Sequence, residues 1–214
     1  MIKRTTALYL ISFLLLVAAV SCTTEDDSVI NEYLDGLTGQ VYTDPAGDIF
    51  GMENRQHDIL SIEVYHDSEL NALLFKIIFA DTVLPVTFSE GLEQLYGYLE
   101  IDVDQIQDSG SLSTIDQFIT EGGLNESLTN MFVDYTVVFH FYDQKFGTVD
   151  INSPGPSDDL AGYAAAVYEE NSCLVIVPID VLTLYNGSVA FALVIGSAPE
   201  ATDLTVAYTY NSIP

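Results

Sequence analysis

The chain has 214 residues, and 32 Asp and Glu against 5 Lys and Arg give it a formal net charge of minus 27, although 49% of its residues are hydrophobic. Acidic chains with few aromatic residues usually stay disordered, but 13 Tyr and 11 Phe supply enough apolar surface for a core. The charge argues against DNA or RNA as a partner, because such binding needs Lys and Arg to neutralise phosphates. The length fits one domain with a short leader.

The N-terminal residues predict export. Lys3 and Arg4 precede an uncharged stretch rich in Leu, Val and Ala at residues 7–20, which is typical of a signal peptide. That stretch is shorter than the roughly 20 residues that a membrane-spanning helix needs. The sequence Ala19-Val20-Ser21-Cys22 resembles the bacterial lipobox, in which small residues precede a Cys that is acylated and becomes the new N-terminus. Ala19 departs from the Leu that usually opens this motif.

This resemblance implies a signal peptide at residues 1–21, a lipidated Cys22 with an acidic tether at residues 22–36, and a folded domain at residues 37–214. The protein is then expected on the outer membrane or cell surface, held to the lipid bilayer through Cys22. Removal of residues 1–21 leaves 3 basic and 32 acidic side chains, a formal charge of minus 29. An ordinary secretory signal is the alternative, and the acidic cluster after Cys22 fits a surface-export signal or a solvated linker.

The second cysteine, Cys173, lies in the apolar run of residues 173–177. If Cys22 is acylated, Cys173 has no partner and is expected to be a small buried apolar residue. A disulfide between Cys22 and Cys173 is the alternative.

From about residue 37 onward, apolar residues recur with period two between clusters of Gly, Pro, Asn and Asp, which predicts many short strands. Residues 60–65 and 73–80 form a predicted hairpin around a turn at residues 67–71, and residues 95–103 predict a strand with one aliphatic face. Residues 113–123 predict a short capped helix that ends at Gly122 and Gly123. Further strands are expected at residues 132–142, 145–151, 163–168, 174–177, 189–195 and 204–210, with a brief helical turn at residues 178–184.

About nine or ten strands with regularly spaced turns predict an all-β fold. We expect a single antiparallel β-sandwich, similar to a jelly roll, with one short helix.

The loop that follows the strand at residues 95–103 is rich in oxygen ligands. It contains Asp102, Asp104 and Asp108 together with Gln105 and Gln107, and a glycine follows at position 110. Such a density of oxygens suits calcium, which takes six to eight oxygen ligands, and carboxylates this close repel one another without a cation. The spacing is not that of an EF-hand, and a solvated acidic turn is the alternative.

A second acidic region contains Asp44, Asp48 and Asp58, the last of which opens a predicted strand. Together with later short motifs, these residues resemble the DOMON-like and carbohydrate-binding-module-family-9-like superfamily of secreted β-sandwich domains. The motifs are Asp44-Pro-x-Gly-Asp48, Asp58-Ile59, Gly97-Tyr98, Ile101-Asp102-x-Asp104-Gln105, Gly110, Asp134-Tyr135 and Pro178-Ile179. The resemblance implies a non-catalytic jelly roll, often with a structural calcium, that binds sugars or haem.

The chain departs from that superfamily in two respects. It has no Trp, so the tryptophan platform of a sugar site is missing, and His57, His66 and His140 have no Met beside them in a haem-binding motif. Tyr96 and Tyr98, on one face of a predicted strand, are the candidate ligand-binding residues, although packing against the sheet is the alternative.

The sequence contains no G-x-S-x-G elbow, H-E-x-x-H, glycine-rich phosphate loop or C-x-x-C motif. We therefore expect a non-catalytic, lipid-anchored binding protein of the cell envelope with a structural calcium site, whose partner is a glycan or an envelope protein. The alternatives are a glycan-binding or glycan-processing component of a saccharide-uptake system and a structural adhesin or assembly subunit.

Overall fold

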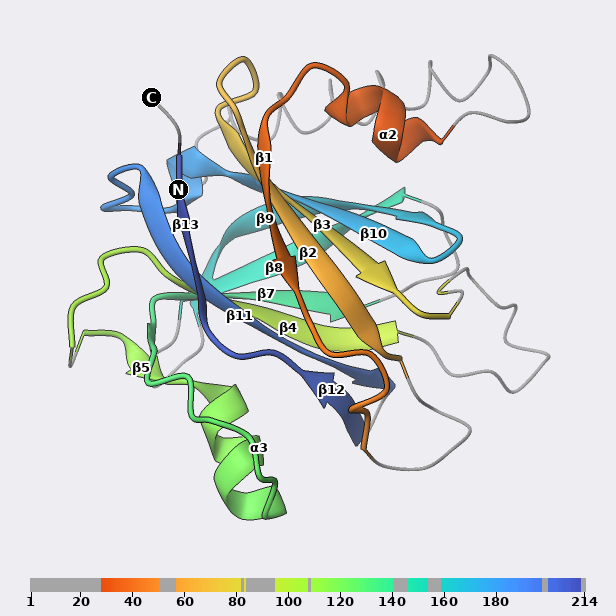
Figure 1. The fold of residues 1–214 in the computed structure, drawn as a ribbon. Coiled ribbons are helices and arrows are strands. Elements are labelled where there is room, and N and C mark those ends of the chain that lie inside the picture. The colour runs from red at the N-terminus through yellow and green to blue at the C-terminus, as the bar shows by residue number, and fades with distance from the viewer. Residues whose placement is uncertain are drawn as a thin grey trace.

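The computed structural model describes residues 28–50, 57–81, 83, 95–107, 109–140, 146–153, 159–197 and 200–212. They form an all-β fold with two short helices (Figure 1). In chain order the elements are α2 (Val29–Leu34), β1 (Gly39–Thr43), β2 (Ile59–Asp67), β3 (Ala72–Phe79), β4 (Leu95–Asp102), β5 (Ser111–Leu112), α3 (Thr114–Gly122), β6 (Phe132–Val133), β7 (Tyr135–His140), β8 (Phe146–Ser153), β9 (Asp159–Glu169), β10 (Ser172–Pro178), the 3-10 turn η2 (Ile179–Val181), β11 (Ser188–Ser197), β12 (Glu200–Leu204) and β13 (Tyr208–Asn211).

Eleven of these strands form one antiparallel sheet in the order β1-β2-β3-β10-β9-β8-β7-β4-β11-β12, with β13 also paired to β11. The strands β7 to β10 are neighbours both in the chain and in the sheet, whereas β4 and β11 meet from distant parts of the sequence. The small strands β5 and β6 form a separate pair. The predicted all-β fold with antiparallel strands is confirmed, and its layers come from one curled sheet.

The curl encloses a single main core. Phe75 of β3 and Phe191 of β11 are not neighbours in the sheet, yet their ring centroids are 5.4 Å apart and both side chains are fully buried. Tyr42 of β1 packs edge-on against Phe191, with ring centroids 5.2 Å apart. These rings therefore fill the space between the two ends of the sheet.

The predicted hairpin is confirmed by the pairing of β2 with β3, and the predicted short helix by α3, whose N-cap is Ser113 and whose C-cap is Gly123. Gly123 has a φ of +66°, a left-handed conformation that favours glycine. The structure also has a second helix, α2, in the second half of the segment that the sequence analysis assigned to the tether.

The two helices cover different parts of the outer face of the sheet. Ile30 and Leu34 of α2 pack over β3, β9 and β10, whereas Ile115 and Ile119 of α3 pack over β11 and β12. This cover explains why β3, β10 and β11 are apolar on both faces, since their outward side chains are buried under a helix. The helices lie at opposite ends of the molecule in Figure 1.

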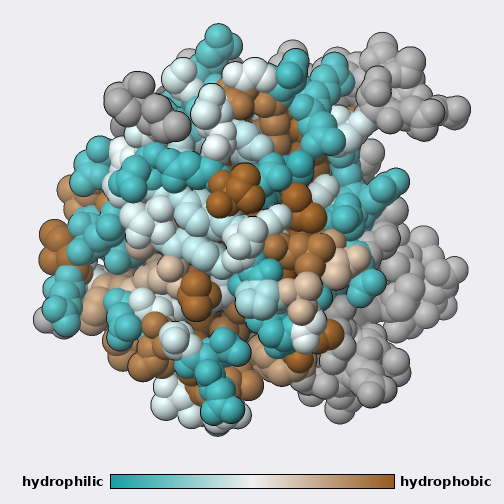
Figure 2. Space-filling model, viewed as in Figure 1, coloured by the Kyte–Doolittle hydropathy of each residue, from teal (hydrophilic) through white to brown (hydrophobic). Residues whose placement is uncertain are grey.

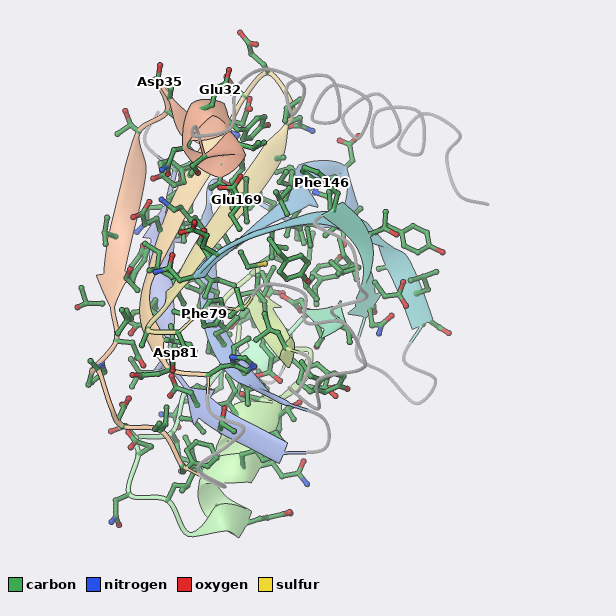
Figure 3. The ribbon with its side chains drawn as sticks, turned by 90° about the vertical axis from the view of Figure 1, so that its right-hand side faces the viewer. Glu32, Asp35, Phe79, Asp81, Phe146 and Glu169 are labelled. Atoms are coloured by element: carbon green, nitrogen blue, oxygen red, sulfur yellow. The ribbon has the colours of Figure 1, made fainter. Side chains whose placement is uncertain are left out.

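Each helix is held by a buried glutamate of the sheet. Glu169 of β9 accepts hydrogen bonds from the Val29 amide (2.7 Å) and the Ser28 hydroxyl at the start of α2, and Figure 3 shows it directly beneath that helix. Glu100 of β4 accepts hydrogen bonds from the Thr114 amide (2.7 Å) and the Ser113 hydroxyl at the start of α3. A carboxylate at a helix N-terminus satisfies unpaired amides and interacts favourably with the helix dipole.

The two ends of the sheet meet along what we call the seam, the contacts of β1 and of residues 44–50 and 57–59 with β12 and β13. Across the seam the Tyr42 hydroxyl donates to the Thr209 carbonyl (2.7 Å), and the Gln40 amide group donates to the Asn211 carbonyl (2.7 Å). Further along, the Phe50 amide donates to the Thr202 carbonyl (2.9 Å). Side chains and loop amides therefore connect the two ends of the sheet, where the described strands are not paired with each other.

We expect Glu169→Ala to lower the free energy of unfolding by about 1–3 kcal/mol, because the amides at the start of α2 lose their buried acceptor. Urea denaturation monitored by circular dichroism measures this change. The control is Glu69→Ala, at an exposed position in the turn between β2 and β3. Equal stabilities of the two variants would contradict the assigned role of Glu169.

Candidate cation sites

The first candidate site lies at the seam. Asp44 follows β1, Asp48 lies in the loop after it, and Asp203 belongs to β12 at the other end of the sheet. One carboxylate oxygen of each residue lies within 4.8 Å of the others. Curling of the sheet thus brings together acids that are far apart in the chain.

Asp58, just before β2, completes this group. It is 7% exposed, and its Oδ2 accepts a hydrogen bond from the Gly47 amide (3.0 Å), which places it against the loop between Asp44 and Asp48. The charges of Asp58 and Asp48 both raise the pKa of Asp44. We call Asp44, Asp48, Asp58 and Asp203 the seam cluster.

Three oxygens of the seam cluster are buried and accept no hydrogen bond from the described residues. They are Oδ2 of Asp44, Oδ1 of Asp48 and Oδ1 of Asp58. A buried acceptor that receives no hydrogen bond costs free energy, so most native examples have a donor, a water or an ion. Three such oxygens in one acidic group make this the best-defined cation site among the described residues.

Asp203 differs from the other three because both of its oxygens have donors. Its Oδ2 accepts from the Ile59 amide (2.6 Å) and its Oδ1 from the Leu204 amide (2.8 Å), and the residue is 1% exposed. The sequence analysis missed Asp203, because it is an isolated acid in a strand with no motif around it.

Burial and mutual repulsion raise the pKa values of Asp44, Asp48 and Asp203. Burial, followed by the charges of Asp44 and Asp48, raises the pKa of Asp203 to about 8. Burial and the Asp48 charge raise the pKa of Asp44 to about 7, although a hydrogen bond from the Tyr208 hydroxyl opposes the shift. The cluster therefore holds protons near neutral pH in the absence of a metal, and a bound cation would compete with them.

The second candidate site is formed by Asp102 at the end of β4, Asp104 in the next turn and Asp134 between β6 and β7. The predicted pair of Asp102 and Asp104 does come together. Asp134 was not among the predicted ligands, because pairing of β4 with β7 brings it to the site. Asp108, the third predicted residue of this loop, lies outside the described residues.

The carboxylates of this second site have more main-chain hydrogen-bond donors than the carboxylates of the seam cluster. Asp102 accepts from the Gln105 amide (2.6 Å), Asp104 from the Ile106 amide (2.9 Å) and Asp134 from the Val103 amide (2.9 Å). Burial raises the pKa values of Asp102 and Asp134. These bonds define the turn after β4, so the site is the weaker candidate for a cation.

Tyr96 and Tyr98 lie side by side on β4. Their rings meet edge to face with centroids 5.3 Å apart, and their hydroxyl groups are hydrogen-bonded to each other. Both are half-buried, and Tyr98 packs against the apolar cluster beneath α3. A role of these two residues in ligand binding stays a prediction.

The structure describes only one of the two cysteines of the sequence. Cys173 is fully buried and free, as expected for a small apolar residue. Cys22 and the predicted signal peptide lie outside the described residues.

The chain matches no protein-family model, no curated protein and no solved structure among those compared with it. Within the part of the chain that the structure describes, no helix has both the length and the apolar character needed to cross a membrane.

We expect Asp44→Asn to weaken the pH dependence of stability in chelator. The pKa of Asp44 is raised from 3.8 to about 7 in the folded protein. The folded state therefore binds this proton more tightly than the unfolded chain, and the free energy of unfolding falls as the pH rises from about 4 to about 7. Asparagine keeps an acceptor for Tyr208 and removes this loss, so the variant gains stability relative to the wild type as the pH rises.

Urea denaturation at a series of pH values measures the effect. Asp159→Asn, at an exposed position of β9, is the control and should follow the wild type. An Asp44→Asn curve parallel to that of the wild type would refute the raised pKa.

Proposed function

We propose that the protein is a non-catalytic, lipid-anchored binding protein of the bacterial cell envelope whose curled sheet is stabilised by calcium at the seam cluster. The observation that carries the calcium part is the set of three buried, unpartnered carboxylate oxygens of Asp44, Asp48 and Asp58. Hydrogen bonds from the part of the chain that the structure describes do not account for them, whereas a cation would.

The donor set suits calcium. The candidate ligands are carboxylate oxygens from the loop after β1 and from β12, and calcium accepts six to eight oxygens in irregular arrangements. Magnesium requires a near-ideal octahedron and keeps several of its waters, so a largely buried all-protein site suits it less. A calcium ion would also offset the repulsion that raises the pKa of Asp44.

The position of the cluster supports a structural role for the ion. Asp44, Asp48 and Asp58 flank β1 and β2 at one end of the sheet, and Asp203 lies on β12 at the other end. An ion held by Asp44, Asp48 and Asp203 would link the two ends and stabilise the closed sheet.

The export and anchoring parts of the proposal rest on the sequence. The basic start, the uncharged stretch at residues 7–20 and the lipobox-like Ala19-Val20-Ser21-Cys22 support lipidation of Cys22. The lack of a catalytic motif in the sequence favours binding over catalysis.

Calcium should raise the melting temperature relative to chelator, because an ion that binds only the folded state stabilises it. The gain is about 2.7 kcal/mol at a calcium concentration one hundred times the dissociation constant. Asp58→Asn should lose most of this gain, since it removes a buried charge but keeps an acceptor for the Gly47 amide. Differential scanning calorimetry with calcium and with chelator measures both effects.

Two variants serve as controls for the calcium experiment. Asp159→Asn should keep the full gain, and Asp104→Asn reports any share due to the second acidic site. Equal melting temperatures of the wild type with calcium and with chelator would remove calcium from the proposal.

Cys22→Ala should move the protein from the membrane fraction to the soluble fraction of the envelope, because the acylated residue is lost. Cell fractionation with immunoblotting measures this shift, and mass spectrometry of the N-terminal peptide detects the lipid. Cys173→Ala should leave the protein in the membrane fraction. A Cys22→Ala variant that stays in the membrane fraction would overturn lipid anchoring.

A further inference from the structure

A groove with a volume of about 770 Å³ lies beside α3, apart from the seam cluster. Its walls are the turn after β4, the β5–β6 pair, α3 and the segment that joins α3 to β6. Figure 2 shows hydrophobic atoms gathered at the lower left of the molecule, where Figure 1 places β5 and α3. Three of the side chains that line the groove are large, apolar and exposed, namely Ile106 (58%), Leu112 (77%) and Leu128 (47%).

The walls of the groove are fixed by specific bonds. Glu100 anchors the start of α3, and Asp116 of α3 accepts hydrogen bonds from the Thr129 amide (2.5 Å) and the Asn130 amide (3.0 Å) on the opposite wall. Gln105 and Asn130 both have a φ of +52°, a strained conformation that persists only where the surroundings enforce it. The groove is therefore shaped before any ligand arrives.

The polar groups of the groove mostly accept hydrogen bonds. Asp102, Asp116 and Glu121 line it, and no Lys, Arg or His is among the described residues that do. Three of its amide side chains are tied through their nitrogens, since Gln105 donates to the Ser188 hydroxyl (2.8 Å), Gln117 to Glu121 (3.1 Å) and Asn130 to the Leu128 carbonyl (3.2 Å). A matching ligand supplies apolar surface together with positively charged hydrogen-bond donors.

We propose that this groove docks a peptide segment of a partner protein that combines aliphatic and basic side chains. A second copy of this chain fits poorly, because its net charge is minus 27. A sugar ring fits less well, because the most exposed apolar side chains of the groove are aliphatic and offer no flat stacking surface. The opposite charges would also speed the encounter of the two proteins.

This inference names the partner class of the binding role proposed above and rests on that role. It is independent of calcium and of lipidation. The calcium experiment measures stability and the groove experiment measures peptide affinity, so each can fail alone.

The test measures fluorescence anisotropy of a short labelled peptide in which leucine and lysine alternate, with the whole protein in calcium-containing buffer. Two comparison peptides replace lysine by glutamate or leucine by serine. The leucine-lysine peptide should bind most tightly, since it alone offers both the apolar surface and the charge.

Variants then locate the binding. Leu112→Ser and Leu128→Ser should each weaken binding about fivefold or more, the effect of losing an apolar anchor. The control is Leu70→Ser, at a 40% exposed position in the turn between β2 and β3 at the far end of the molecule. Glu121→Gln should weaken binding about two- to threefold, and its control is Glu69→Gln in that same turn.

Three results would overturn the proposal. The first is equal binding of the serine-lysine peptide, which would reduce the effect to net charge. The second is an equal effect of Leu70→Ser and Leu112→Ser. The third is no peptide binding in an assay where neutral oligosaccharides bind and Leu112→Ser abolishes that binding, which would assign the groove to sugars.

Discussion

The structure depends on how buried carboxylates are stabilised in a chain with few cationic side chains. With 32 acidic residues and 5 Lys and Arg, ion pairs such as that between Lys76 and Glu63 (3.6 Å) cannot serve most acids. Main-chain amides, in place of cationic side chains, donate the hydrogen bonds that stabilise buried carboxylates. They donate to Glu100 and Glu169 at the helix starts and to Asp203 in the interior. Transfer of a charge out of water is costly unless such donors meet it.

The same constraint explains how the helices dock. Neither α2 nor α3 is long enough to be stable alone in water. Each combines an apolar contact with the sheet and a glutamate of the sheet that accepts from its first amides. The acid and the helix therefore stabilise each other, and both helices of the described residues cover the sheet where such a glutamate lies. At Asp44, Asp48 and Asp58, one buried oxygen each accepts no hydrogen bond from any residue that the structure describes.

Local patterns in the sequence predicted most of the strands, the β2–β3 hairpin and α3, because alternation, a serine cap and a glycine stop are visible within a few residues. The strand β1 was not predicted, and the strand expected at residues 204–210 is divided between β12 and β13. Helix α2 was missed, since its decisive partner Glu169 lies 140 residues away from Val29. Distance along the chain also explains which candidate ligands were predicted and which were missed. Asp44, Asp48 and Asp58 lie close together in the chain, whereas Asp203 and Asp134 reach their sites only through the folding of the sheet. Period-two patterning also could not tell a single curled sheet from two stacked ones.

The docking of α2 on the sheet limits how the domain can stand on a membrane. If Cys22 carries the lipid, the six residue steps to Ser28 span at most about 20 Å. The end of the molecule that carries α2 must then stay near the bilayer. Because α3 lies at the opposite end (Figure 1), the groove beside it would face away from the membrane, toward whatever approaches the cell. A short, well-anchored helix next to a lipidated Cys22 would thus set the direction in which the domain presents its surface.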